Sequence, residues 1–190
     1  MKRFVFVATL LFSFVTQNAL ADSYKNIETL VKGDLHYMIA YNDNLKQDVK
    51  TFWVWHLPEK NKELFKDTKI EENVSMSNLD RINVEAAIEY LAVSCFGEDK
   101  VFDSKGRSNI SNITYKIHIH SGKVYLVNIL FYGDVYKLIT DEEILNFIEK
   151  VNLMKIKVND IEKYDEHTYA IRNFMMYDKD KGYYPIKGNE

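Results

Sequence analysis

The clearest indication of the fold is Ile113-Thr-Tyr-Lys-Ile-His-Ile-His-Ser-Gly-Lys-Val-Tyr-Leu-Val-Asn-Ile-Leu-Phe-Tyr132. Apolar and polar residues alternate from Ile113 to His120. A period of two predicts a strand with one face in the core and the other facing water. Ser121-Gly122 then separates two strand-like runs, and a glycine that can take a positive φ suits a tight turn. The stretch therefore predicts an antiparallel hairpin.

A helix is predicted shortly after this hairpin, at residues 140–151. The Thr140 hydroxyl can cap its start, and Glu143, three residues on, can complete a capping box. Apolar residues then recur at i, i+3, i+4 and i+7 and form one stripe that would pack on a sheet face. These residues are Ile144, Phe147, Ile148 and Val151.

Shorter patterns predict further elements on both sides of this unit. Residues 49–57 are apolar on both strand faces, which suggests a strand covered from two sides. Residues 27–31 suggest a short helix, and residues 83–88 have some helical content before a β-rich run. The other strand patterns lie at residues 35–41, 88–96, 101–102, 154–158 and 169–177.

The expected fold class is α+β. The chain has only two prolines and seven glycines, and it has no repeated segment and no segment that resembles a linker. The sequence therefore gives no reason to divide it into two domains. We therefore expect a single domain at residues 22–190, an antiparallel sheet with the helix at 140–151 packed on it, and a loose tail at about 178–190.

The N-terminus predicts export. Lys2 and Arg3 precede an apolar run at residues 4–15, and Ala19-Leu-Ala21 suits a cleavage site, so residues 1–21 match a signal peptide. The mature chain has no second apolar stretch long enough to span a membrane, and residue 22 is not a cysteine that could carry a lipid. We expect no transmembrane anchor and a periplasmic, extracellular or cell-surface location.

Charge and cysteine content narrow the possible partners and chemistry. Cleavage after Ala21 would remove two basic residues and change the formal net charge from −3 to −5. Basic residues are scattered among acidic ones, so nucleic acid is not expected as a partner. Cys95 is the only cysteine and cannot form an intrachain disulfide. Its apolar surroundings favour a buried, inert thiol, although a reactive or intermolecular thiol remains an alternative.

Histidines and acidic residues give weak signals for metal sites. His118 and His120 share one strand face, where His36, His56 and His167 could in principle join them. Thr114 and Lys116 lie on that face too, which favours a solvated surface, so no metal ligand is assigned. Residues 178–182 resemble a calcium loop, but the glycine comes one place early and position 189 is Asn, so a plain turn is expected.

No catalytic or cofactor-binding residue is assigned. The acidic run Asp141-Glu-Glu143 is explained by helix capping and the helix dipole. The chain lacks a Gly-x-Ser-x-Gly elbow and a glycine-rich phosphate loop, and Cys95 has no histidine at a recognisable catalytic spacing. We expect no enzyme and no cofactor.

Aromatic residues favour a binding role. The chain has 13 tyrosines, 11 phenylalanines and two tryptophans, residues that dominate both cores and recognition surfaces. Most should be core residues. Four tyrosines lie near turns or the tail and could be exposed: Tyr132, Tyr136, Tyr183 and Tyr184.

Residues 49–151 resemble the surface-adhesin protein E family of exported bacterial proteins. The resemblance depends on Phe52-Trp-Val-Trp55, Tyr90-Leu-Ala-Val-Ser-Cys95, the tyrosine-rich hairpin and residues 134–148. It implies a small antiparallel sheet with one packed helix and, as in characterised adhesins, attachment to host matrix or plasma proteins. The chain departs from the family because no second cysteine lies near Val151 and about forty residues follow the helix.

These observations predict an exported, non-catalytic binding protein, adhesin-like or associated with the envelope, with a protein partner. The alternative is a periplasmic inhibitor or immunity protein that blocks a toxin or hydrolase. Small size, export, negative charge and the missing catalytic motifs fit both hypotheses.

Overall fold

The computed structural model describes residues 27–42, 45–56, 69–71, 74 and 78–179. The predicted signal peptide lies outside these residues, as does the predicted tail from residue 180 onwards. None of the described helices combines the length and apolar character needed to cross a membrane.

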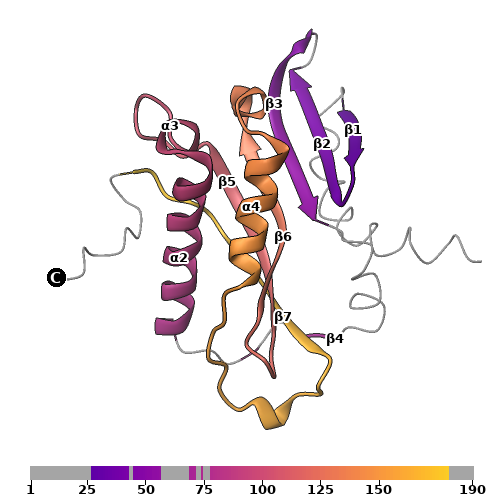
Figure 1. The fold of residues 1–190 in the computed structure, drawn as a ribbon, viewed down its shortest axis with the longest axis vertical. Helices are drawn as coiled ribbons and strands as arrows, with labels where there is room; N and C mark the ends of the chain where they lie inside the picture. The colour runs from indigo at the N-terminus through magenta and orange to yellow at the C-terminus, as the bar shows by residue number, and fades with distance from the viewer. Residues whose placement is uncertain (1–26, 43–44, 57–68, 72–73, 75–77, 180–190) are drawn as a thin grey trace, which may run out of the picture.

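A seven-stranded sheet forms the centre of the described structure (Figure 1). Its strands run in the order β1-β2-β3-β6-β5-β7-β4. The first six in this order pair antiparallel, and the two-residue strand β4 pairs parallel with β7. The strands are β1 (Ile27–Lys32), β2 (Leu35–Asn42), β3 (Leu45–His56), β4 (Lys69–Ile70), β5 (Ile110–His118), β6 (Val124–Tyr132) and β7 (Thr168–Phe174).

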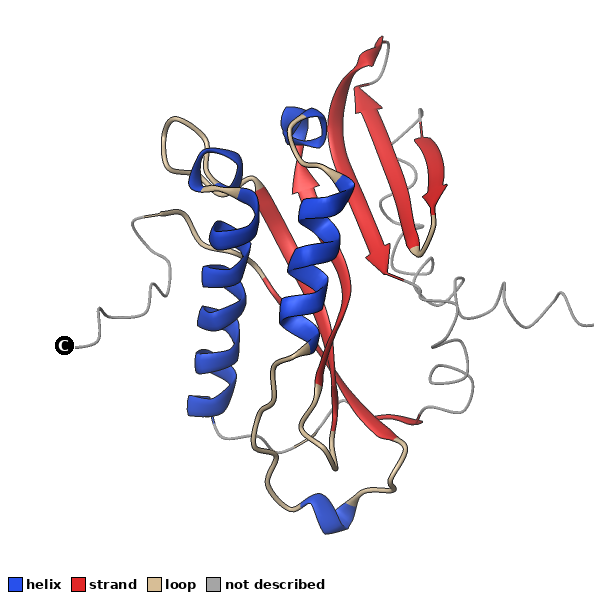
Figure 2. Ribbon diagram, in the orientation of Figure 1, coloured by secondary structure: helices blue, strands red, loops and turns tan. Residues whose placement is uncertain are grey.

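Helices α2 (Asn78–Phe96) and α4 (Asp141–Asn152) lie side by side in front of the sheet in the view of Figures 1 and 2. The apolar stripe predicted for the second of these helices is buried against the sheet: Ile144, Phe147, Ile148 and Val151. Short helices α3 (Glu98–Val101), η3 (Gly133–Lys137) and η4 (Ile161–Lys163) complete the described elements. The predicted α+β fold is therefore confirmed.

The predicted hairpin is β5 followed by β6. Ile113 lies opposite Ile129 in the register of the two strands, and both side chains are fully buried. Gly122 in the connection has a φ of 65°, the positive value expected for a tight turn. Strand β5 ends at His118, so the last two residues of the predicted strand lie in the turn.

Four phenylalanines join the sheet to the helices. Phe52 of β3 and Phe131 of β6 are stacked, with ring centroids 4.5 Å apart. Phe96 of α2 meets Phe131 edge to face, with ring centroids 5.8 Å apart. It also meets Phe147 of α4, whose ring is tilted against it at a centroid distance of 5.0 Å. These contacts identify the face of β3 and β6 that is turned towards the helices.

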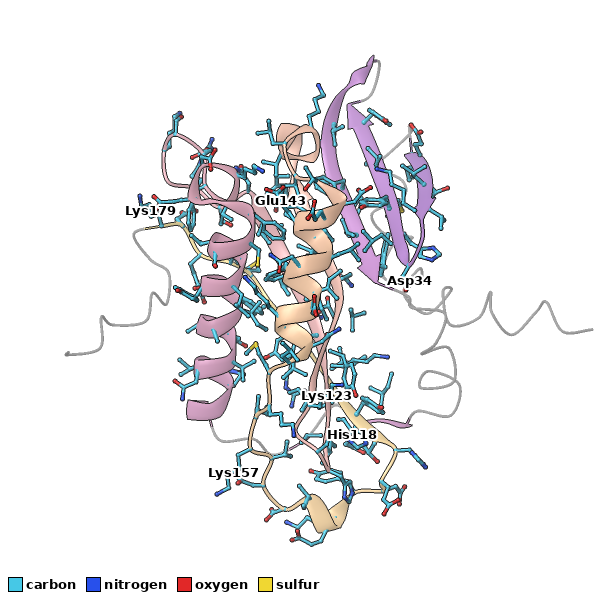
Figure 3. The ribbon with its side chains drawn as sticks, viewed as in Figure 1. Asp34, His118, Lys123, Glu143, Lys157 and Lys179 are labelled. Atoms are coloured by element: carbon cyan, nitrogen blue, oxygen red, sulfur yellow. The ribbon has the colours of Figure 1, made fainter. Side chains whose placement is uncertain are left out.

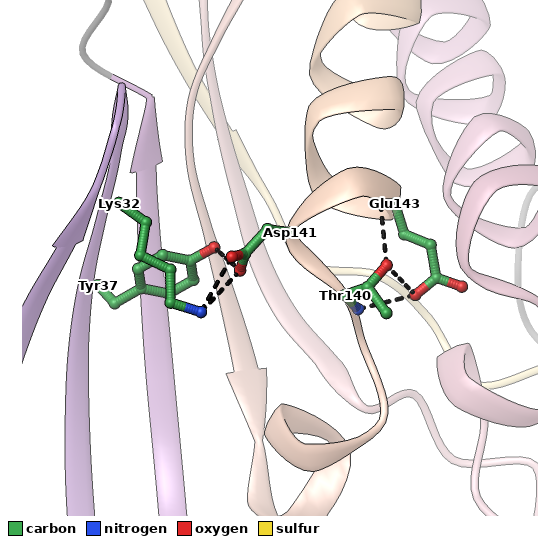
Figure 4. Close-up of polar contacts among 5 residues, drawn as sticks. All are labelled: Lys32, Tyr37, Thr140, Asp141 and Glu143. Carbon is green, nitrogen blue, oxygen red and sulfur yellow. Dashed lines mark hydrogen bonds and ion pairs between the residues drawn. The ribbon is translucent and has the colours of Figure 1, made fainter.

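The start of α4 has the predicted capping box (Figure 4). The Glu143 backbone N–H donates to the Thr140 hydroxyl at 3.2 Å, and the Thr140 backbone N–H donates to the Glu143 carboxylate at 2.8 Å. Both donors would otherwise lack a partner within the helix. The box therefore fixes where α4 begins.

Replacing Thr140 with alanine is expected to lower the free energy of unfolding by about 1 kcal/mol, because the Glu143 N–H loses its acceptor. Urea denaturation followed by far-ultraviolet circular dichroism measures this loss. Thr140→Ser keeps the hydroxyl and should remain within about 0.5 kcal/mol of the natural protein. Equal losses in the two variants would contradict a capping role.

The strand predicted at residues 88–96 is wrong, because these residues form the second half of α2. A short apolar run such as Leu91-Ala-Val93 fits a buried strand and a buried helix equally well. The period becomes clear only when the buried residues of the whole helix are compared. The buried apolar residues lie at helical spacing: Val84, Ile88, Ala92, Cys95 and Phe96.

Three smaller predictions also fail. Residues 27–31 lie in β1 rather than in a helix, because the turn at Gly33 pairs them with β2. Val101 ends α3, and Phe102 makes only a single bridge to Ser108. Residues 154–158 form no strand, since only Lys155 bridges to the hairpin turn. The local sequence pattern was not sufficient in any of these segments, because pairing with distant residues decides their structure.

Candidate functional site

The sheet has one face that none of the described helices covers (Figure 2). Successive side chains of a strand point to opposite faces, so residues next to Phe52 and Phe131 point away from the helices. We call this surface the helix-free face. Its described residues on the four central strands are Thr51, Trp53, Trp55, Asn112, Thr114, Lys116, His118, Tyr125, Asn128, Leu130, Tyr132, Tyr169, Ile171 and Asn173. Three of them are buried: Thr51, Lys116 and Tyr169.

Two tryptophans lie in β3 at the centre of this face. Trp53 is opposite Leu130 and Trp55 is opposite Asn128 in the pairing of β3 with β6. Residues two apart in a strand are separated by about 6.6 Å, so the two indoles are neighbours. Both are partly exposed. The Phe52-Trp-Val-Trp55 pattern was visible in the sequence, but it did not show which rings face the helices.

Next to the tryptophans, side chains from three strands form a neutral polar cluster around Thr114. The Thr114 hydroxyl lies 2.6 Å from the side-chain oxygen of Asn173, 3.1 Å from that of Asn128 and 3.4 Å from that of Asn112. A hydroxyl can donate only one hydrogen at a time, and each amide also has an NH₂ group with two donors. The cluster therefore has hydrogen-bonding capacity beyond these contacts. We call it the amide cluster.

Lys116 lies between β6 and β7 on the same face. Its register neighbours are Tyr125 and Ile171, and only 9% of the residue is exposed. Burial lowers the pKa of Lys116 to about 8, so about nine in ten side chains are charged at pH 7. Lys123 lies close by, with its Nζ 4.9 Å from the centre of the Tyr125 ring.

The predicted metal candidates His118 and His120 bind the backbone of a neighbouring loop. His118 Nε2 donates to the Glu166 carbonyl at 2.6 Å, and its Nδ1 lies 2.7 Å from the Ser121 hydroxyl. His120 Nε2 donates to the Tyr164 carbonyl at 2.7 Å. These contacts hold the loop before β7 against the end of the hairpin.

His36 and His167 do not join this pair within the described structure. His36 lies in β2, which is separated from β5 by β3 and β6, and His167 is an exposed residue just before β7. His56 is the last residue of β3, and its side chain lies outside the described residues. Among the described residues, no three histidine, cysteine, aspartate or glutamate side chains are grouped as metal ligands would be.

The acidic run at the start of α4 has structural contacts (Figure 4). Asp141 accepts hydrogen bonds from the Tyr37 hydroxyl at 2.6 Å and from Lys32 at 2.9 Å. Burial raises the pKa of Asp141, but these two partners outweigh it, and the net pKa lies below the usual value. Glu143 adds an ion pair with Lys100 at 2.5 Å. The run therefore links α4 to β1, β2 and α3.

Cys95 is buried as predicted. Burial raises the pKa of its thiol, and the Asn146 side chain lies 3.7 Å from the sulfur. Asp178, in the predicted turn, accepts a hydrogen bond from the Ser108 backbone N–H at 3.3 Å. Residues 180–182 of that turn lie outside the described residues, as do Tyr183, Tyr184 and the side chain of Tyr136.

A buried polar cluster beneath α2 was missed by sequence reasoning. The Tyr115 side chain is fully buried, and its hydroxyl has no hydrogen-bond partner in the described part of the chain. Burial raises its pKa, as does the charge of Glu85, while Arg172 acts in the opposite sense. Arg172 also donates to the Val74 carbonyl at 3.1 Å. The sequence did not reveal this cluster, because Tyr115 and Arg172 come together only through the pairing of β5 with β7, and Glu85 comes from α2.

Comparison with known proteins adds only a limited structural similarity. No family model matches this chain, and no curated protein matches it. A crystal structure of a DUF5043 family protein from Bacteroides uniformis ATCC 8492 has a TM-score of 0.47 and 13% identity, covering 82% of this chain and 93% of that one. A similarity at this level says nothing about function.

Proposed function

We propose that this chain is an exported, non-catalytic binding protein, adhesin-like or associated with the envelope, which contacts its partner through the helix-free face. The supporting observation is the position of Trp53 and Trp55 side by side on a face that no described helix covers. Tryptophan and tyrosine are enriched among the residues that contribute most to binding. The tryptophan pair is therefore the expected centre of the contact.

The two sides of β3 support this proposal. Phe52 and Val54 are buried towards α2 and α4, which explains the apolar residues on one side. The sequence pattern predicted cover on both sides, but the described helices cover only one. A partner bound on the other side would remove additional aromatic surface from water, which favours association.

Replacing Trp55 with alanine is expected to weaken partner binding by at least about tenfold, because a central aromatic anchor is removed. The exported chain would serve as bait with extracts and surface fractions of the native organism, and a captured partner would then be titrated against both forms. Thermal unfolding of the variant would establish that it remains folded.

Tyr90→Ala is the matched control, because Tyr90 is an aromatic residue of α2 and is 58% exposed. Binding lost in Tyr90→Ala but retained in Trp55→Ala would place the contact on the helices and contradict the proposal. Retention in the cytoplasm would refute export. Capture of a hydrolase or toxin with loss of its activity would support an inhibitor instead of an adhesin.

A further inference from the structure

We propose that the helix-free face binds an anionic polysaccharide, with Trp53 and Trp55 against sugar rings, the amide cluster facing sugar hydroxyls, Lys123 facing carboxylate or sulfate groups, and the buried Lys116 adding positive charge beneath them. This inference rests on the proposed function, since it names a class of partner for the same face.

The first argument is the separation of charge between the two sides of the sheet. The described strand positions of the helix-free face include Lys116 and no aspartate or glutamate. At its margin lie Lys123, which packs against Tyr125, and Glu166, whose backbone carbonyl accepts a hydrogen bond from His118. The chain as a whole has a formal net charge of −3. Acidic residues gather instead on the helices that cover the opposite face: Glu85, Glu89, Glu98, Asp99, Asp141, Glu142, Glu143 and Glu149.

Complementary charge favours an anionic ligand on this face. Lys116 is charged at pH 7 even with its lowered pKa. Figure 3 places Lys123 and His118 towards the same end of the sheet, near the turn between β5 and β6. Both lysines therefore lie on the β5 and β6 part of the face, next to the aromatic and amide groups.

The second argument is the pairing of aromatic rings with neutral amides. A sugar ring has C–H groups on its faces and hydroxyls at its rim. The negative face of an aromatic ring attracts the C–H groups of the sugar. An amide can donate hydrogen bonds to the sugar hydroxyls and accept hydrogen bonds from them. Asn128 combines the two features, because it lies opposite Trp55 in the sheet and contacts Thr114 at 3.1 Å.

The position of these groups favours a polysaccharide over an acidic peptide. An extended peptide usually binds by adding a strand to the edge of a sheet. The described edges of this sheet are β1 and β4, whereas the tryptophans, the amide cluster and Lys116 lie on β3, β6, β5 and β7. Groups in the middle of a face are suited to a ligand that lies across the strands.

Titration with defined polysaccharides tests this inference. The exported chain would be titrated by calorimetry with polygalacturonate, chondroitin sulfate and neutral dextran at 50 and 500 mM NaCl. We expect binding to at least one anionic polymer, at least about tenfold weaker binding at high salt because the lysine charges are screened, and no comparable binding to dextran.

Variants then separate the three parts of the face. Trp55→Ala should weaken binding at least about tenfold. Lys116→Met fills a similar volume without the charge and should weaken binding severalfold and reduce its salt dependence. Asn173→Ala changes an exposed member of the amide cluster with little risk to folding and should also weaken binding. Lys105→Met, at an exposed site in the loop before β5, should change nothing.

Three further outcomes distinguish this inference from the proposed function. If neither anionic polymer binds, or if dextran binds equally well, the polysaccharide inference is overturned. If an acidic protein is captured instead and Trp55→Ala abolishes its binding, the helix-free face remains the contact surface with a different partner. Binding that does not respond to any substitution on this face would overturn both proposals.

Discussion

Replacing Phe131 with alanine is expected to lower the free energy of unfolding by about 3–5 kcal/mol, the usual cost of deleting a fully buried phenylalanine ring. Phe131 is 0% exposed. Its ring is stacked on Phe52 and meets Phe96 edge to face, so one side chain joins two central strands to α2. Urea denaturation followed by circular dichroism would measure the loss.

Tyr132 supplies the control for this prediction. It is the next residue in β6, points to the opposite face and is 49% exposed, although its hydroxyl accepts a hydrogen bond from Ser111 at 2.7 Å. Tyr132→Ala should therefore cost no more than about 1 kcal/mol. A similar loss in both variants would mean that the phenylalanine contacts are not what joins the two layers.

Replacing Gly122 with alanine is expected to destabilise the protein by at least about 3 kcal/mol, through overpacking and backbone strain. A Cβ atom at this position would lie 1.9 Å from the Ile156 carbonyl oxygen, so the backbone would have to move. Movement would disrupt the hydrogen bond from the Ile156 N–H to the Gly122 carbonyl, which is 2.8 Å long. Thermal and urea unfolding would report the change.

Gly33→Ala is the control that separates backbone strain from overpacking. Gly33 has a similar positive φ of 59°, but a Cβ atom there would meet nothing within 4 Å. Gly33→Ala should therefore show only the cost of the left-handed backbone conformation, about 1 kcal/mol. If the two alanine variants were equally unstable, the close approach of residues 122 and 156 would have no energetic importance.

The elements that were predicted correctly from the sequence are those that depend on interactions between residues close together in the chain. The alternation in β5, the glycine turn and the capping box of α4 each involve residues within four positions of one another. Part of α2 was predicted as a strand because an apolar run of that length fits either structure. Packing of α2 against the sheet and α4 decided it, as the contacts of Phe96 illustrate.

The candidate site could be predicted only in fragments. The tryptophans were recognised as part of a strand, Tyr132 as an exposed aromatic, and His118 with His120 as a pair on one face. The sequence did not indicate the amide cluster, because Thr114, Asn128 and Asn173 come from three strands and meet only through the register of the sheet. Both histidines proved to bind backbone carbonyls of a distant loop.

The sequence by itself determined the α+β class, the central hairpin and the start and stripe of α4, because hydrophobic period, turn chemistry and capping act over a few residues. Only the tertiary structure decided the strand order, the helical state of residues 88–96 and the composition of the helix-free face. These depend on which distant segments pair and pack, and strand order cannot be inferred from spacing along the chain. The same strand pairing places Trp55 beside Asn128 and thereby assembles the surface on which the proposed binding depends.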